Sequence, residues 1–272
     1  MARYPAASSF APIPFDKHGV PGTIEIVDDF VTATPLADAV DGNGAIFHSE
    51  YEWLASEIAG GAVSNITIVA AVDDHPGVIS LNVGATTPAD GDAAALQLGG
   101  DVDDSQEMFN LDTNGVYIAA VLRIPDVDAQ IIEFGLAGQA PAVPNSSAAD
   151  IVSFVWDPED AANVGDELFL CQVNGAGTDV EAATSLVPYV QNDWVLLEIA
   201  ADSSSATFRI TTEDNTQTIQ LTAADGVVMP TVGLRPVFSV ENVGSAEELL
   251  AIDLFVLRYL RRDALVAGWL GA

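Results

Sequence analysis

Basic residues are scarce in this chain of 272 residues, which has 8 lysines and arginines against 40 aspartates and glutamates. Its formal net charge is −32, and Lys17 is the only lysine. Self-repulsion of this size disfavours a compact fold unless salt screens it, and halophilic proteins use such a charge to stay soluble. We therefore expect a protein adapted to high salt, with a merely acidic protein as the alternative. Nucleic acid is not expected as a partner, because its phosphates would be repelled.

Cysteine is also scarce, and long apolar runs are missing. The single cysteine, Cys171, excludes an intrachain disulfide or a multi-thiolate metal site, and its apolar flanks predict a buried, inert thiol. No stretch approaches 18 consecutive apolar residues, so we expect no membrane span. The first fifteen residues lack a basic region followed by a long apolar run, so no secretory leader is expected.

The sequence shows no long amphipathic helix and instead contains about a dozen β-rich runs bounded by Gly, Pro and Asp. The strongest of these runs are 115–124, 129–136, 151–156, 167–173, 194–200, 206–210, 217–221, 234–240 and 249–257. Such a succession predicts an all-β fold, a two-sheet antiparallel jelly-roll sandwich. No linker divides the chain, so one sandwich is expected over 24–257.

The two chain ends differ from this body. Residues 1–23 combine prolines and aromatics without periodicity, which predicts an extended arm that is either disordered or laid along a partner. Residues 258–272 join arginines to an apolar stretch and predict a docking tail, with local pairing to carboxylates as the alternative. Between the ends only Arg123, Arg209 and Arg235 are basic. The expected assembly contacts are Tyr4, Phe10, Phe15, Arg258, Arg261, Arg262 and Trp269.

Two parts of the chain resemble a known family. One runs over 74–87 and 94–100, with the stretch His75-Pro76-Gly77-Val78-Ile79-Ser80-Leu81, and the other comprises 192–199, 206–210 and 250–257. Together they resemble the concanavalin A-like (laminin G-like) jelly rolls of structural proteins of tailed viruses. The resemblance implies a virion surface protein, a head decoration or turret subunit that contacts other virion proteins. The alternative is a tail fibre or spike module that recognises host-surface glycans. We expect a homo-oligomer, since decorations sit on symmetry axes.

Catalysis is not expected from the residues. Glycosidases of this fold need two carboxylates about 5–10 Å apart, usually on alternate residues of one strand. Only Glu50 and Glu52 alternate, in a segment that is either strand or short helix. His18, His48 and His75 are isolated, and no nucleophile–histidine–acid arrangement can be recognised.

Metal and glycan sites have weaker candidates. Asp101, Asp103 and Asp104 could supply oxygen ligands to Ca²⁺, although a solvated, salt-tolerant loop is the better explanation in so acidic a chain. Trp53 and Trp156 are the candidates for stacking on a sugar ring, because Trp156 ends a strand at an acidic loop. No other cofactor is expected.

Overall fold

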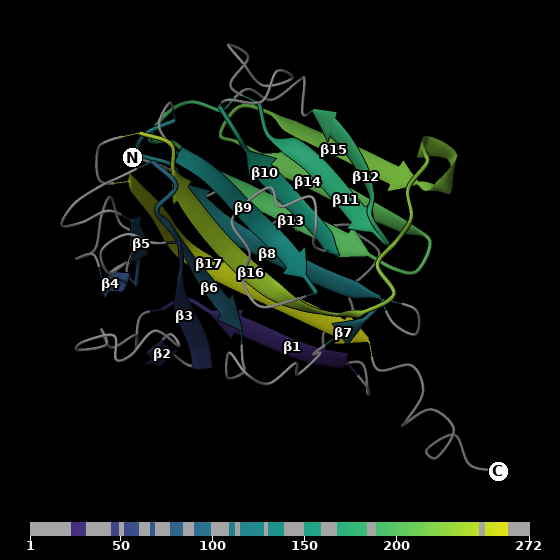
Figure 1. Ribbon diagram of the computed structural model, residues 1–272, viewed down its shortest axis with the longest axis horizontal. Coiled ribbons are helices and arrows are strands. Elements are labelled where there is room, and N and C mark those ends of the chain that lie inside the picture. Colours follow the sequence, from purple (N-terminus) through teal and green to yellow (C-terminus); the bar gives the residue numbers. More distant parts are fainter. Residues whose placement is uncertain are drawn as a thin grey trace.

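The computed structural model describes residues 23–30, 45–48, 52–59, 66–68, 77–83, 90–98, 109–111, 115–127, 130–138, 150–158, 168–183, 189–244 and 248–260. These residues form two antiparallel sheets that lie one over the other (Figure 1). The all-β sandwich predicted from the sequence is therefore confirmed. The helical structure in the described residues is a single 3-10 turn, Ala223–Asp225, whose N-terminus is capped by Thr222.

The first sheet, sheet A, contains both the first and the last strand of the sandwich. Its order is β15 (Thr216–Thr222), β14 (Ser205–Thr211), β13 (Trp194–Ala201), β8 (Val116–Arg123), β17 (Glu248–Leu260), β5 (Ile79–Val83) and β4 (Ile66–Ile68). The long strand β17 also pairs with β1 (Thr23–Asp28), from Thr23↔Leu260 to Asp28↔Phe255. The first and the last strand that the structure describes are thus neighbours within this sheet.

The second sheet, sheet B, contains the remaining strands. Its order is β12 (Thr178–Ala183), β11 (Leu170–Gly175), β10 (Ile151–Trp156), β9 (Gln130–Ala137), β16 (Gly233–Asn242), β6 (Ala93–Leu98), β3 (Glu52–Ala59) and β2 (Ala45–His48). A short strand, β7 (Phe109–Asn110), pairs with the start of β16. The segment around Glu52, ambiguous in the sequence, is therefore a strand.

Strand β16 changes its partner part-way along its length. β7 pairs with Gly233 and Leu234, whereas β6 pairs with residues from Val237 to Glu241. Arg235 and Pro236 lie between these two pairings, and proline has no N–H to donate to a ladder. On that side of β16, the described residues therefore leave a break in the sheet beside Arg235.

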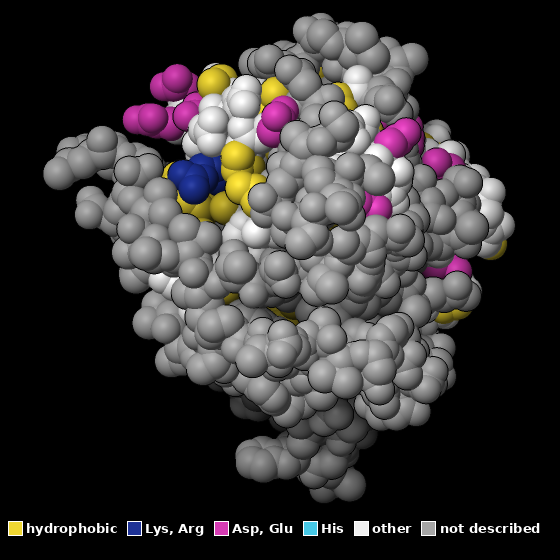
Figure 2. Space-filling model, turned by 60° about the vertical axis from the view of Figure 1, so that its left-hand side comes forward, with side chains coloured by type: hydrophobic (Ala, Val, Ile, Leu, Met, Phe, Trp, Pro, Cys, Tyr) yellow, Lys and Arg dark blue, Asp and Glu magenta, His cyan; other side chains and the backbone are white. Residues whose placement is uncertain are grey.

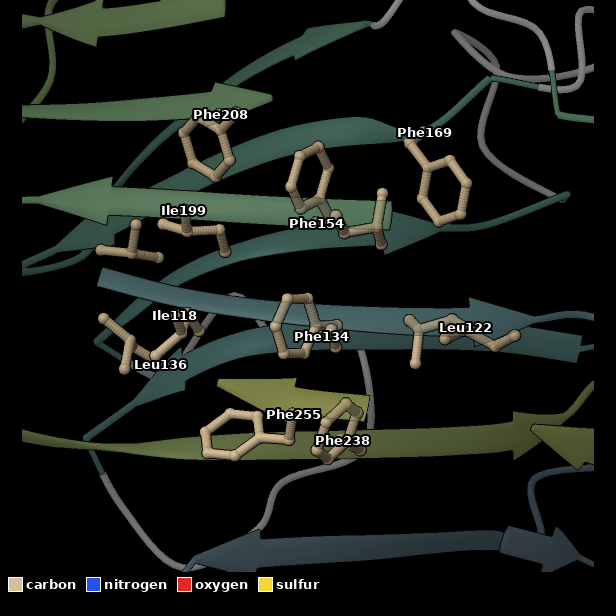
Figure 3. Packing of buried hydrophobic residues seen from close by; sticks show 14 of the residues in the cluster. Ile118, Leu122, Phe134, Leu136, Phe154, Phe169, Ile199, Phe208, Phe238 and Phe255 are labelled. Carbon is tan, nitrogen blue, oxygen red and sulfur yellow. The ribbon is translucent and has the colours of Figure 1, made fainter. Parts of the chain in front are cut away.

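The core fills the space between the sheets. Aromatic and aliphatic side chains from both sheets point into this layer, among them Phe134, Phe154 and Phe238 from sheet B and Ile118, Phe208 and Phe255 from sheet A (Figure 3). Phe134 and Phe238 stack with ring centroids 5.0 Å apart. Cys171 is fully buried in the same cluster, as predicted, and burial raises the pKa of its thiol, so it stays protonated and inert.

Two buried polar contacts link distant segments. The Trp53 Nε1–H on β3 donates to Asp28 Oδ2 at the end of β1, at 2.9 Å, which joins sheet B to sheet A. The buried Tyr189 hydroxyl accepts from the backbone N–H of Ile124 at 2.7 Å and donates to the carbonyl of Asp193 at 2.8 Å. These contacts satisfy polar groups that burial would otherwise leave unpaired, so we expect both to contribute to stability.

Candidate functional site

Sheet B has one face toward the core and one turned outward. Side chains of a strand alternate between the two faces. On β16 the core takes Leu234, Phe238 and Val240. The side chains between them, at Arg235, Val237, Ser239 and Glu241, therefore belong to the outer face.

Strand register brings four polar residues together in the middle of this face. Val237 pairs with Gln97 on β6 and, on its other side, with Gly135 on β9, and Gly135 in turn pairs with Ser153 on β10. Arg235 and Ser239 lie two residues before and after Val237 on the same strand. Gln97, Ser153, Arg235 and Ser239 thus surround the Val237–Gly135 pair, and we call these four residues the central polar cluster.

The central polar cluster is shielded from solvent, and its side chains lack hydrogen-bond partners among the residues that the structure describes. Gln97, Ser153 and Ser239 are 0% exposed and Arg235 is 5% exposed. Among the described residues, both side-chain polar atoms of Gln97 and the hydroxyls of Ser153 and Ser239 have no hydrogen-bond partner. Within the same part of the chain, the Arg235 side chain forms no ion pair or hydrogen bond. Each unsatisfied buried polar group costs about 1–3 kcal/mol, so four together need an explanation beyond folding.

Gly135 leaves the centre of the face without a side chain. A Cβ at this position would lie 2.4 Å from the carbonyl oxygen of Val152 and 2.5 Å from Cα of Ser153. Only glycine permits this close approach of β9 to β10. The surrounding polar groups therefore border a small apolar floor formed with Ala95, Ala137, Ile151 and Val237.

A row of residues, one from each strand and mostly polar, connects this centre with the edge of the sheet. In the order of the strands it runs Glu181, Gln172, Ser153, Gly135, Val237 and Gln97. At the edge, Asp179 and Glu181 on β12 are exposed, and Gln172 Nε2 donates to Asp179 Oδ2 at 3.1 Å and to Glu181 Oε1 at 3.2 Å. Among the described members of this row, the exposed end is therefore the β12 edge.

The outer face of sheet A contrasts with this arrangement, because its charged groups pair with one another. Glu198 Oε1 accepts from the Tyr117 hydroxyl at 2.9 Å, and its Oε2 lies 3.3 Å from Arg209 Nε. Arg258 Nε donates to Glu25 Oε1 at 3.0 Å, and its guanidinium lies over the Tyr117 ring. Hence these charged groups have structural partners, whereas the central polar cluster has none in the described part of the chain.

Glu198 supplies a pH-dependent prediction. Burial raises the pKa of this carboxyl above its ordinary value of 4.5, although Tyr117 and Arg209 oppose the effect. The folded state then holds the proton more tightly than the unfolded state, so the contribution of Glu198 to stability falls as pH rises above about 4.5. We expect Glu198→Gln to lose less thermal stability than wild type between pH 4.5 and 7.5. Equal losses in calorimetric scans at both pH values would contradict this assignment.

The two tryptophans proposed for sugar stacking lie in the core. Trp53 is 0% exposed and packs against Phe30, Phe238 and Phe255, and Trp156 is 2% exposed against Phe169 and Tyr189. The Trp156 Nε1–H donates to the carbonyl of Val127 at 2.9 Å. The prediction of exposed stacking platforms is therefore wrong. The position of Trp156 at a strand end predicts a surface residue, but the alternation of β10 places its side chain on the core face.

Arg258 is also placed differently from the prediction. Strand β17 continues to Leu260, so the sandwich extends three residues past the expected boundary at 257. Arg258 lies within that strand and pairs with Glu25, as the alternative of local pairing proposed. It belongs to the sheet and not to a tail.

The other predicted contacts and ligands lie outside the described residues. These are Tyr4, Phe10, Phe15, Arg261, Arg262 and Trp269 for assembly, and Asp101, Asp103 and Asp104 for Ca²⁺. The described part of the chain contains no group of three or more His, Cys, Asp or Glu side chains placed to hold a metal. Nor do the residues described here include a helix long and apolar enough to cross a membrane.

The described surface carries much acidic character. On the face shown in Figure 2, acidic side chains lie at several places around a small hydrophobic area next to a basic one. The central polar cluster is hard to recognise from local sequence pattern, because all four members lie within strands whose alternation is ordinary. Arg235 offered the one usable clue, as one of three basic residues in the body of the chain.

Comparison with solved structures identifies the fold. A protein of unknown function from Shewanella oneidensis MR-1 aligns with a TM-score of 0.55 at 9% identity, over 89% of each chain. The seed lectin of Lotus tetragonolobus aligns with a TM-score of 0.53 at 11% identity, over 89% of this chain and all of the lectin. Lectin I of Ulex europaeus, in complex with the methyl glycoside of α-L-fucose, aligns with a TM-score of 0.51 at 11% identity, over 88% of this chain and 98% of the lectin.

The chain therefore has the concanavalin A-like jelly-roll fold of the legume lectins. At these identities the likeness establishes the fold alone. No protein-family model matches the sequence, and no curated protein matches it.

Proposed function

We propose that this protein is a carbohydrate-binding module whose site is the outer face of sheet B, centred on the central polar cluster. The observation that carries the proposal is the set of buried amide, hydroxyl and guanidinium groups that lack partners among the described residues. Sugars present many hydroxyls, which donate and accept hydrogen bonds, and so can satisfy such groups. A fold shared with lectins supports the same choice.

The proposal concerns binding without turnover. The sequence predicts a role at a virion surface, either as a decoration or as a glycan-recognising tail module, and binding by sheet B favours the second of these. The virion location, the high-salt habitat and the homo-oligomer remain predictions from the sequence. Ca²⁺ on the loops also remains a prediction.

The test is a glycan array probed in high salt with wild type and two matched variants. Gln97→Leu removes an amide of the central polar cluster, and Gln220→Leu makes the same change at an exposed position on sheet A. We expect saturable binding that falls at least about fivefold in Gln97→Leu, since a lost hydrogen bond of this kind is worth about 1 kcal/mol or more. Gln220→Leu should bind as wild type does. No binding by wild type, or equal binding by both variants, would refute the proposal.

A further inference from the structure

Arg235 is the most unusual member of the central polar cluster, because it is a buried cation with no counter-ion among the residues that the structure describes. Its side chain is 5% exposed, and burial alone lowers the pKa of its guanidinium. The other two arginines of the body have partners: Arg209 pairs with Glu198, and Arg123 lies 4.9 Å over the Trp194 ring. In a chain with 40 acidic residues, an arginine left without a carboxylate is unexpected.

The carboxylates of the same face are too far away to pair with it. Glu133 pairs with Ser239, four residues along β16 from Arg235, which corresponds to about 13 Å along the strand. Asp179 lies in the same cross-strand row as Arg235, and the row continues from Asp179 through Asn174, Ile151 and Ala137 to Arg235. Four strand spacings separate Asp179 from Arg235, which corresponds to about 19 Å between their backbones. Of the carboxylates on this face that the structure describes, none therefore pairs with Arg235.

The surroundings of Arg235 suit an anionic group. A guanidinium offers five N–H donors in a planar fork that matches a carboxylate or a sulfate. Gln97, diagonal to Arg235 across Val237, adds an amide with no partner in the described residues. A neutral hydroxyl could accept one hydrogen bond but could not balance the charge.

We propose that Arg235 anchors an anionic substituent, a carboxylate or a sulfate, of the bound glycan, and so makes the site selective for acidic sugars. This inference rests on the proposed carbohydrate-binding function. Arg235 and Gln97 hold the anionic group, while Ser153 and Ser239 bind neighbouring hydroxyls. In the ligand-free protein the buried charge of Arg235 lowers stability. The anionic group of the ligand compensates this charge on binding.

The test compares acidic glycans with neutral counterparts in 1 M NaCl, where screening shortens to about 3 Å and the net charge of −32 no longer repels an anionic ligand at a distance. The probes are oligogalacturonate with its methyl-esterified form, and a sulfated oligosaccharide with its desulfated form. Wild type is compared with Arg235→Met and with Arg123→Met, which removes the same charge from sheet A. Affinities are measured by calorimetry and melting temperatures in the same buffer without ligand.

We expect wild type and Arg123→Met to prefer at least one acidic probe over its neutral form by at least about tenfold, and Arg235→Met to show no preference. Arg235→Met should also melt about 2–6 °C higher, because it removes an uncompensated buried charge. Binding without an acidic preference would overturn this inference and leave the carbohydrate-binding proposal standing. A lower melting temperature for Arg235→Met would show a structural role and also overturn it. Absence of binding to any probe or array glycan would overturn both.

Discussion

Gly135→Ala is expected to destabilise the protein by about 3 kcal/mol, near the upper end for an overpacked buried position. The added Cβ would lie 2.4 Å from the carbonyl oxygen of Val152 and 2.5 Å from Cα of Ser153. Both are backbone atoms, which cannot move aside as the end of a flexible side chain can. Strands β9 and β10 would have to separate in the middle of sheet B. Chemical denaturation with urea measures the change.

Gly177→Ala provides the matched control for this prediction. Gly177 has φ of +76° in the β11–β12 turn, and a Cβ there meets nothing within 4 Å. Its replacement costs only the strain of the left-handed conformation, about 1 kcal/mol. If Gly135→Ala proved no more destabilising than Gly177→Ala, the close approach of β9 and β10 would be wrong.

Asp28→Ala is expected to cost about 3 kcal/mol of stability, because it removes two buried hydrogen bonds from one carboxylate. In the wild-type protein the Trp53 indole N–H and the Phe30 backbone N–H donate to the Asp28 carboxylate at 2.9 and 3.0 Å. The variant leaves both donors without this acceptor. Phe30 also has φ of 54°, a left-handed conformation that the bond from its N–H to Asp28 helps to hold.

Asp29→Ala is the control for the Asp28 prediction, since its side chain is the exposed neighbour on the same segment. A surface substitution of this kind changes stability by about 0.5 kcal/mol or less. Urea denaturation of both variants distinguishes the two positions. Similar small losses for both would show that the link between Asp28 and Trp53 contributes little to the joining of the sheets.

The strands were largely predictable because their core-facing residues alternate with others. The run at 151–156 coincides with β10, and 249–257 lies within β17. Strand β12 was missed because its sequence, Thr178–Ala183, has only Val180 and Ala182 to pack toward the core. Strand β7 is two residues long and exists only through its pairing with Gly233 and Leu234. Neither strand has a local pattern from which it could be recognised.

The candidate site was not predictable from local pattern, for a different reason. Gln97 and Val237 are 140 positions apart in the sequence, and only sheet register makes them neighbours. Whether Arg235 has a counter-ion depends on the same long-range pairing. The sequence pattern instead favours aromatic residues at strand ends as a glycan site, but the alternation of β3 and β10 directs Trp53 and Trp156 into the core.

The most direct test of the account is a crystal structure of the protein grown at high salt with a bound acidic oligosaccharide. The account predicts density for the sugar over the Val237–Gly135 pair, with an anionic oxygen within hydrogen-bond distance of the Arg235 guanidinium. Density for the sugar on the outer face of sheet A or at the loop ends, with Arg235 still unpaired, would contradict it.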